Sequence, residues 1–386
     1  MNKNSKIFIA GGTGLVGSAI IRNLLSKGYN NLISSFNRKK PQEYENSLIK
    51  FYPINMISQL DVNSFFEKER PEYVFLSAAK VGGIVANNTY KADFIYDNIM
   101  ISSNVIHASY KYGIKKLLNL GSSCIYPKLS PQPMKEEYLL SGALEPTNEP
   151  YAIAKIAAIK MCRYFNEQYG TNFISVMPSN LYGTNDNFNL VDSHVLPALI
   201  RKFYLAKLLS QEDYKNIKND FRIAGNSKLH IDNKTVVIAN DTSKEDMLLA
   251  LNYFGIKTDS LNANNNQYIT NQINVSLWGT GTPFREFLYV DDLADAVVYL
   301  MENYDYKDIG EFINIGSGID LTIKELASIV KRIVGFTGTI SFDVSKPDGT
   351  PKKLLDISHL KSLGWSPSVS LEDGITKVYD WYKNRS

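Results

Sequence analysis

Two side chains four residues apart, Tyr151 and Lys155, carry the clearest chemical signal in this chain of 386 residues. They follow Glu149-Pro150, a pair typical of a helix start, so both side chains should leave one face of one helix. The ammonium favours a phenolate and should lower the tyrosine pKa from its usual value of ~10. The pair predicts a proton donor, although alone it is more often a solvated helix face.

Three polar side chains, Ser122, Ser123 and Cys124, directly follow an apolar run at residues 116–120 that predicts a buried strand. A parallel strand delivers the side chains after it to a crevice. The Ser122 hydroxyl could share a carbonyl oxygen with the Tyr151 phenol, which is the arrangement needed to protonate a carbonyl during its reduction. Cys124 could act as a base, because the usual thiol pKa of ~8.5 falls beside cations. A small inert core residue is the alternative for Cys124.

A glycine-rich turn lies near the start of the chain, between an expected strand at residues 7–10 and an amphipathic helix expected from 15 to about 27. Gly11, Gly14 and Gly17 form G-x-x-G-x-x-G. Such glycines let the backbone approach a pyrophosphate, and the helix N-terminus offers amide donors. The turn therefore predicts a dinucleotide site, with a tight turn that binds nothing as the alternative.

The end of the second expected strand, residues 32–35, indicates which dinucleotide is bound. Asn37 and the basic run Arg38-Lys39-Lys40 follow it, and no acidic residue occurs before Glu43. NAD-binding chains usually place a carboxylate here for the ribose, whereas a basic residue accommodates the 2′-phosphate of NADP. We therefore expect NADP(H) at Arg38, with a solvated charge cluster as the alternative.

The composition is that of an ordinary globular protein, with 44% hydrophobic and 21% charged residues and a net charge of +3. The longest basic run is Arg38-Lys39-Lys40, so no nucleic-acid partner is expected. No apolar stretch approaches the ~18 residues of a membrane span. Two cysteines are too few for a disulfide framework and fit a reducing cytoplasm. No metal site is predicted.

Strands alternate with helices along most of the chain, which predicts an α/β fold with a doubly wound parallel sheet and a smaller C-terminal α/β substrate lobe. We expect a dinucleotide-binding domain at residues 1–182, completed by about 286–318, and a substrate lobe at 183–285 and 319–386. Further strands are expected at 73–76, 174–177 and 312–316, and helices at 92–112, 149–169 and 322–335.

The segments GSSCIYP, EPTNEPYAIAK, PSNLYG and SHVLPALIRKF together resemble the GDP-L-fucose synthase family of extended short-chain dehydrogenases/reductases. The resemblance covers residues 6–203 and 277–381. It implies a Rossmann-type fold and a homodimer that packs through the helices at 92–112 and 152–169. It also implies an enzyme that epimerises a GDP-4-keto-6-deoxy sugar at C3 and C5 and then reduces it at C4 with NADPH.

The resemblance also assigns roles to individual residues. Ser122, Tyr151 and Lys155 would catalyse reduction, while Cys124 would be the base and His194 the acid of epimerisation. Asn98 would support the backbone of the site, although a purely structural buried amide is equally open. The residues expected at the cofactor are Gly11, Gly14, Leu15, Val16, Gly17, Arg38, Ala78, Lys80, Asn98, Tyr151, Lys155, Pro178, Asn180, Leu181 and His194. The residues expected at the substrate are Ser123, Asn180, Arg201, Trp278, Arg285, Lys346 and Asp348.

Residues 204–276 depart from the family pattern and predict an inserted subdomain. Its LHIDNKTVVIAN stretch predicts a hairpin around Asp232-Asn233, and a helix capped by Ser243 and ended by Gly255 should follow. This insertion keeps open a reductase that does not epimerise and that acts on a GDP-4-keto-6-deoxy-heptose. A non-catalytic dinucleotide-binding protein is a further alternative. The presence of Ser122, Tyr151 and Lys155 argues against it.

Overall fold

The computed structural model describes residues 1–36, 48–258 and 272–385, and these form two compact units. Unit 1 comprises Met1–Asn185, Glu286–Asp320 and Lys353–Val369. Unit 2 comprises Asp186–Arg285, Leu321–Lys352 and Ser370–Ser386. Residues 353–369 therefore pack with unit 1, whereas the sequence-based division placed them in the substrate lobe. The Arg38 cluster lies outside the described residues.

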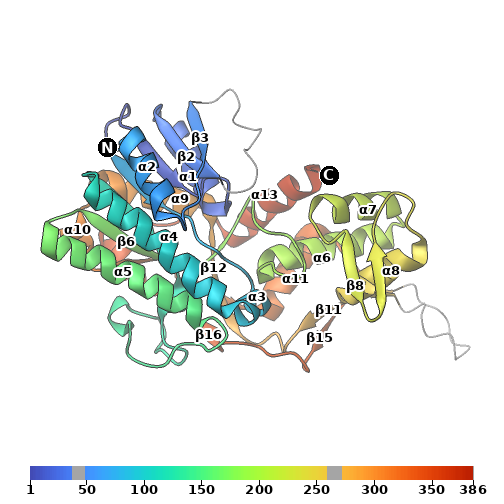
Figure 1. The fold of residues 1–386 in the computed structure, drawn as a ribbon. Coiled ribbons are helices and arrows are strands. Elements are labelled where there is room, and N and C mark those ends of the chain that lie inside the picture. The colour runs from blue at the N-terminus through green and yellow to red at the C-terminus, as the bar shows by residue number, and fades with distance from the viewer. Residues whose placement is uncertain (37–47, 259–271, 386) are drawn as a thin grey trace, which may run out of the picture. The chain divides into compact units, whose positions relative to one another are not determined.

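A seven-stranded parallel sheet organises unit 1 (Figure 1). Its strands, in spatial order, are β13 (Ile313–Ile315), β6 (Phe173–Pro178), β5 (Lys116–Leu120), β4 (Tyr73–Leu76), β1 (Ile7–Ala10), β2 (Leu32–Phe36) and β3 (Ile49–Pro53). Every neighbouring pair is parallel. The strands are short runs of mostly buried apolar residues, as expected when helices cover both faces of a parallel sheet. The predicted doubly wound α/β fold is confirmed.

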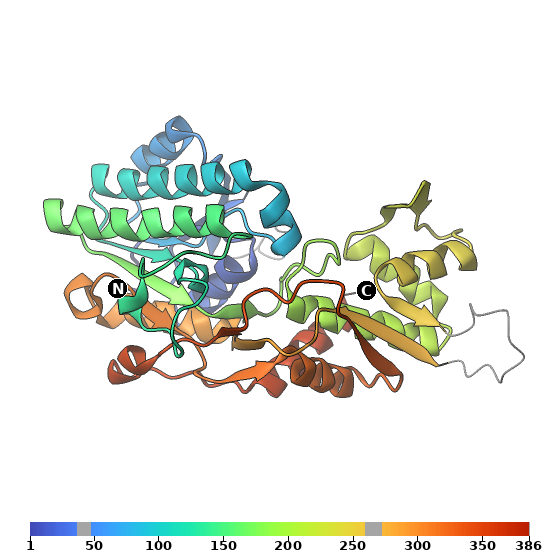
Figure 2. The same ribbon diagram turned by 90° about the horizontal axis from the view of Figure 1, so that it is seen from below.

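Helices cover both faces of this sheet. On one face, α1 (Leu15–Ser26) and α9 (Val290–Asn303) enclose an apolar core with the strands. On the other, α2 (Gln59–Glu69), α4 (Lys91–Lys111) and α5 (Glu149–Tyr169) enclose a second core. Figure 2 shows α4 and α5 running side by side along the unit. The ends predicted for α1, α4 and α5 agree with the structure to within one residue.

Shorter elements complete unit 1 at the edges of the sheet. They are α3 (Ile84–Thr89), the 3-10 helices η2 (Ser123–Ile125) and η3 (Glu136–Tyr138), β7 (Asn180–Tyr182), α10 (Tyr306–Ile309) and α12 (Ser358–Ser362). Strand β7 pairs in parallel with β12 (Phe284–Tyr289), and a small sheet has the order β14 (Asp320–Thr322), β12, β16 (Lys352–Lys353).

Unit 2 combines a three-stranded sheet with packed helices. The sheet order is β10 (Ile256–Thr258), β11 (Ile273–Trp278), β15 (Thr339–Asp343), and the helices are α6 (Val195–Ser210), α11 (Ile323–Val334) and α13 (Leu371–Asn384). Helix α11 shows how the sequence sets an element's ends. Thr322 and Glu325 form a reciprocal capping box at its start, and Gly335 ends it in the left-handed conformation at φ 76°.

The inserted segment forms α7 (Tyr214–Ile223), the hairpin β8 (Lys228–Ile231) and β9 (Lys234–Val237), and α8 (Lys244–Tyr253), coloured green-yellow to yellow in Figure 1. The hairpin turns at Asp232, which has φ 50°. The Ser243 hydroxyl accepts from the Asp246 amide at 3.1 Å, and Gly255 follows the helix at φ 83°. The predicted hairpin and capped helix are confirmed, whereas α7 was not predicted. No helix in the described part of the chain has the length and apolarity that a bilayer crossing requires.

Candidate active site

Helix α5 presents Tyr151 and Lys155 from one face, as predicted. The Lys155 ammonium nitrogen lies 5.7 Å from the centroid of the Tyr151 ring. It donates to the carbonyl oxygen of Leu120, the last residue of β5, at 2.8 Å. Lys155 is almost fully buried. This bond fixes the first turns of α5 against the end of β5, so that the tyrosine lies beside the residues that follow this strand.

The electrostatics of the pair differ from the simple sequence expectation. Burial raises the pKa of Tyr151, negative charge at Cys124 raises this pKa further, and a hydrogen bond from Ser122 opposes the rise. Burial also lowers the pKa of Lys155 to about 8. The prediction that the ammonium lowers the phenol pKa is therefore wrong, because desolvation of Tyr151 raises that pKa. Tyr151 consequently keeps its proton at neutral pH, which is the state that a proton donor needs.

Ser122 and Cys124 lie at the start of η2, directly after β5. The Ser122 hydroxyl accepts from the Cys124 amide at 3.3 Å, and the intervening Ser123 is buried. Cys124 is partly exposed. Its sulfur accepts from the Asn148 amide nitrogen at 3.3 Å, and the Lys353 ammonium lies 4.0 Å from the same sulfur. The side chains that the sequence assigned to chemistry in unit 1 are thus brought together at one strand end.

The glycine turn between β1 and α1 has the geometry that a dinucleotide pyrophosphate requires. Gly11 has φ 85°, and a Cβ on it would lie 2.9 Å from the Ala78 Cα atom. A Cβ on Gly17 would lie 2.2 Å from the Gly11 carbonyl oxygen. Gly14 caps α1 without any side-chain hydrogen bond, so the amides of the first turn face no capping group. Leu15 and Val16 follow in that turn, and the fit to an anionic cofactor is good.

The segment after β4 is held by Asn98. The Asn98 side-chain oxygen accepts from the Lys80 amide at 2.9 Å, and its nitrogen donates to the Lys80 carbonyl at 3.0 Å. The Lys80 ammonium pairs with Asp97 at 2.8 Å and with Asp93 at 3.2 Å. Asn98 therefore fixes the backbone that leaves β4, where Ala78 approaches the glycine turn.

Pro178, Asn180 and Leu181 lie at the end of β6 and in β7. The Asn180 side-chain nitrogen donates to the Glu286 carbonyl oxygen at 2.7 Å, so it links β7 to β12. All three residues are in unit 1, which also holds the glycine turn and α5.

Unit 2 contains four of the expected substrate residues, Trp278, Arg285, Lys346 and Asp348. Trp278, at the end of β11, is 59% exposed, and the Lys346 ammonium lies 5.5 Å from its ring centroid. The Asp348 carboxylate accepts from the amide and the hydroxyl of Thr280, at 2.7 and 2.8 Å. Arg285 donates to the Phe284 carbonyl at 2.7 Å. An exposed aromatic ring with a cation beside it suits a base and its phosphates.

His194 and Arg201 lie at the N-terminus and in the middle of α6, and they differ sharply in environment. His194 is the exposed N-cap of this helix. Arg201 is 0% exposed and donates to the Asp220 carboxylate at 2.7 Å. Its other bonds go to Phe188 O, Ala224 O, Gly225 O and Asn226 Oδ1. The expectation that Arg201 contacts substrate is therefore not supported, because the N–H donors of its guanidinium bind acceptors within the protein.

The neighbouring Lys202 differs from Arg201 in its surroundings. It is only partly buried, and burial lowers its pKa to about 8. Among the described residues, no carboxylate forms an ion pair with its ammonium.

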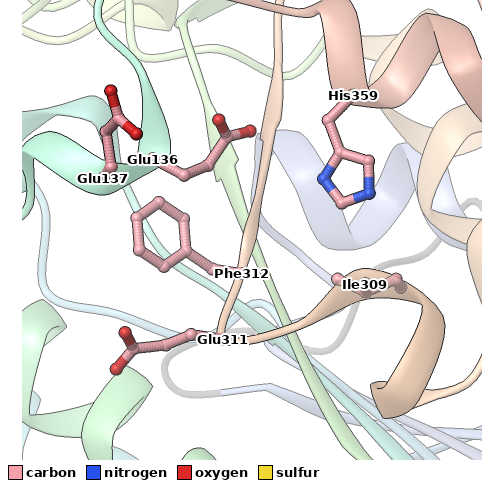
Figure 3. Close-up of a pocket in the computed structure, with 6 residues that line it drawn as sticks. All are labelled: Glu136, Glu137, Ile309, Glu311, Phe312 and His359. Carbon is pink, nitrogen blue, oxygen red and sulfur yellow. The ribbon is translucent and has the colours of Figure 1, made fainter.

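A pocket in unit 1 is lined by side chains other than these (Figure 3). Glu136, Glu137, Glu311 and His359 line it with Ile309 and Phe312, and none of them was predicted to bind cofactor or substrate. Glu311 pairs with Lys160 at 2.6 Å, and Glu136 accepts from the Asn314 amide at 3.0 Å. Two of the three carboxylates that line this pocket therefore make contacts that stabilise the fold.

A doubly wound sheet with a glycine turn after its first strand and a Tyr-Lys pair beside a later strand end defines the extended short-chain dehydrogenase/reductase class. The model of the NAD dependent epimerase/dehydratase family matches residues 7–221 and 255–316. The chain belongs to this family and, within it, to the GDP-L-fucose synthases. The unmatched residues between those ranges fall inside the inserted segment.

Relatives match over nearly the whole chain. GDP-L-fucose synthase 1 of Arabidopsis thaliana is 46% identical over 381 residues, which covers 99% of this chain and 94% of the relative. GDP-L-fucose synthase of Escherichia coli K12 is 43% identical over 383 residues, covering 98% and 96%. A crystal structure of a GDP-6-OMe-4-keto-L-xylo-heptose reductase from C. jejuni is 42% identical with a TM-score of 0.84, covering 100% of this chain and 99% of that one.

Proposed function

We propose that this protein is an NADPH-dependent enzyme that epimerises a GDP-4-keto-6-deoxy sugar at C3 and C5 and reduces it at C4. The observation that carries the proposal is that Ser122, Cys124 and Tyr151 lie close together after β5. A sugar carbonyl bound beside them could receive a proton on its oxygen, while Cys124 removes a proton from a neighbouring carbon. The names of the relatives, GDP-L-fucose synthases of plants and bacteria, support this reaction.

NADPH would be held by the glycine turn, by Asn180 and Lys155, and by Arg38 at the 2′-phosphate; when bound, it supplies the hydride that reduces C4. The amides at the start of α1 bind the pyrophosphate, because no side chain caps them. The related C. jejuni GDP-mannoheptose C4 reductase was solved with NADP bound and is 41% identical to this chain.

In the reduction, Tyr151 donates its proton to the C4 oxygen as negative charge develops there. Burial keeps the phenol protonated until that moment. Ser122 donates a hydrogen bond to the same oxygen, and Lys155 stabilises the phenolate that remains. The buried ammonium does this from a fixed position, because the Leu120 carbonyl holds it.

In the epimerisation, Cys124 removes a proton from a carbon next to the C4 carbonyl. Only C3 and C5 are adjacent to that carbonyl, so a single ketone acidifies both positions by spreading the charge onto oxygen. His194 is the proposed acid that returns a proton from the opposite face.

Trp278, Arg285, Lys346 and Asp348 are the proposed contacts for the GDP group. The exposed Trp278 ring can stack on the guanine, and Arg285 and Lys346 supply positive charge for the diphosphate. Arg201 is left out of this set, because its donors are used inside unit 2.

We further propose a cytoplasmic homodimer formed through α4 and α5. Aromatic side chains on these helices are exposed, among them Tyr96, Tyr110, Tyr164 and Tyr169. The ring centroids of Tyr110 and Tyr169 are 4.3 Å apart, so these two exposed rings lie against each other. Sedimentation of the wild type and of Tyr164→Glu tests this, with a dimer expected only for the wild type.

A reductase that does not epimerise, acting on a GDP-4-keto-6-deoxy-heptose, is the second candidate. The observation in its favour is the similarity to solved heptose enzymes, which reaches a TM-score of 0.84 at 42% identity. The retained Cys124 and His194 favour the bifunctional enzyme.

One experiment separates these functions. GDP-4-keto-6-deoxymannose and its heptose counterpart are each incubated with NADPH in deuterated water, and the products are identified by NMR. The proposal expects deuterium at C3 and C5 together with NADPH oxidation. Reduction without deuterium entry identifies the reductase alone, and no NADPH oxidation on either sugar identifies a binding protein without turnover.

A further inference from the structure

We propose that Lys353 and Asn148 are positioning residues that hold the Cys124 side chain as a thiolate, ready to remove a proton from the sugar. The inference rests on the proposed function, in which Cys124 is the base. It assigns the activation of that base to two residues, one from the start of α5 and one 229 positions away in the chain.

Asn148 occupies the N-cap of α5 but does not cap it. Asparagine is among the best N-cap residues, because its side-chain oxygen normally accepts from an amide of the first turn. Here the Asn148 side chain makes no cap hydrogen bond, and its nitrogen donates to the Cys124 sulfur at 3.3 Å. Its oxygen is buried without a hydrogen-bond partner. A side chain that gives up a favourable local bond in this way is typical of a functional site.

Lys353 brings a positive charge to the same sulfur. Its ammonium lies 4.0 Å from the Cys124 sulfur, and among the described residues no carboxylate forms an ion pair with it. The Tyr151 phenol also interacts electrostatically with Cys124, and the Lys155 ammonium lies 5.7 Å from the centroid of the Tyr151 ring. The thiolate is therefore the anion best placed to balance the Lys353 charge.

The position of Lys353 is fixed by the three residues that follow it. Leu354 accepts from the Met134 amide at 2.7 Å, and the Asp356 amide donates to the Met134 carbonyl at 2.9 Å. The Leu355 amide donates to the fully buried Glu286 carboxylate at 2.9 Å. The segment that carries the lysine is thus bonded on both sides, which holds its ammonium near the sulfur at little entropic cost.

The proposed step is balanced without any further reagent. The C–H bond next to the carbonyl breaks, the proton moves to the Cys124 sulfur to form a thiol, and the electron pair moves to the carbonyl oxygen as an enolate. Asn148 and Lys353 neither gain nor lose a proton. They act on Cys124 before the step, by favouring its charged form over the neutral thiol.

The test measures how fast iodoacetamide alkylates Cys124 in the full-length protein as a function of pH. Cys162 is 1% exposed, and mass spectrometry of the labelled peptides distinguishes the two cysteines. Lys353→Met should move the alkylation profile to higher pH by about one unit, which slows alkylation about tenfold at neutral pH. Lys353→Arg should restore much of the rate. Lys352→Met, at the adjacent lysine, is the matched control and should stay within about twofold of wild type.

Asn148→Asp separates a positioning role from a structural one. Aspartate keeps the shape and is an equally good N-cap, so α5 should be at least as stable as in wild type. It removes the donor to the sulfur and adds a negative charge, so the profile should again move to higher pH. Deuterium entry at C3 and C5 should fall in parallel in Lys353→Met and Asn148→Asp.

Two results would overturn the inference, and they differ in whether the proposed epimerase function also fails. If Cys124→Ser abolishes deuterium entry while Lys353→Met and Asn148→Asp keep the wild-type profile and exchange, the proposed function holds and the activation by these residues is wrong. If Cys124→Ser exchanges deuterium as fast as wild type, Cys124 is not the base, and the epimerase role fails together with the inference.

Discussion

Replacing Arg201 with methionine should destabilise the protein strongly and leave its ligand-binding groups in place. The side chain is completely buried, and its guanidinium bonds to Asp220, to three backbone carbonyls and to Asn226. Asp220 is buried as well and also accepts from the Tyr382 hydroxyl. Methionine fills a similar volume but leaves the Asp220 carboxylate without its counter-ion.

The size of the effect follows from that uncompensated charge. Removing one partner of a buried ion pair costs ~3–5 kcal/mol, because the remaining charge stays desolvated. This is a large share of the ~5–15 kcal/mol by which a typical domain is stable. In the double variant Arg201→Met with Asp220→Asn no buried charge is left, so most of the loss should be recovered.

Urea unfolding followed by circular dichroism measures this change in the free energy of unfolding. The matched control is Lys202→Met, at a partly buried side chain one position along α6, which should change stability by less than about 1 kcal/mol. A loss below about 1 kcal/mol for Arg201→Met, joined to a loss of substrate affinity, would show that Arg201 binds the ligand after all.

Three further predictions concern catalysis. Tyr151→Phe should abolish NADPH oxidation while the dissociation constant for NADPH, from fluorescence titration, stays near wild type; turnover above about a tenth of wild type would assign the proton to another group. Neutral residues in place of Arg38 and Lys39 should raise KM for NADPH and leave KM for NADH largely unchanged. An equal rise in both KM values would show that these residues do not recognise the 2′-phosphate. Lys155 is charged below its pKa of about 8, so the rate of reduction should fall as the pH rises through about 8; a rate that is flat there argues against its role.

The sequence predicted the local parts of this protein well, because local rules decide them. The strand Lys116–Leu120 and the start of α5 at Glu149 agree with the structure to the residue. The hairpin at Asp232 and the Ser243 cap were predicted from turn and capping chemistry alone. The glycine turn has the close approaches that its spacing indicated.

The remaining features depend on contacts between distant residues. Arg201 was expected at the substrate from the family resemblance, but its guanidinium binds a buried carboxylate and backbone carbonyls instead. Only the fold shows that Asp220 faces it. The Tyr151 pKa was predicted from one neighbour, whereas burial by many residues decides it. Lys353 and Cys124 are 229 positions apart in the chain, so no local pattern in the sequence predicts that they lie close together.

The path of the chain between the two units has a consequence for how the protein is made. Six successive segments alternate between unit 1 and unit 2, so the backbone passes from one to the other five times. Unit 1 lacks β13 until residue 315 has been synthesised, and it lacks the segment that carries Lys353 until residue 369. Unit 2 receives its last helix, α13, from residues 371–384. Domains that are continuous in sequence can fold one after another on the ribosome. Here the segments of unit 1 are separated by those of unit 2, and unit 1 is not complete before residue 369, so the two units should fold together rather than one after the other, and residues 1–185 alone should not form a stable unit.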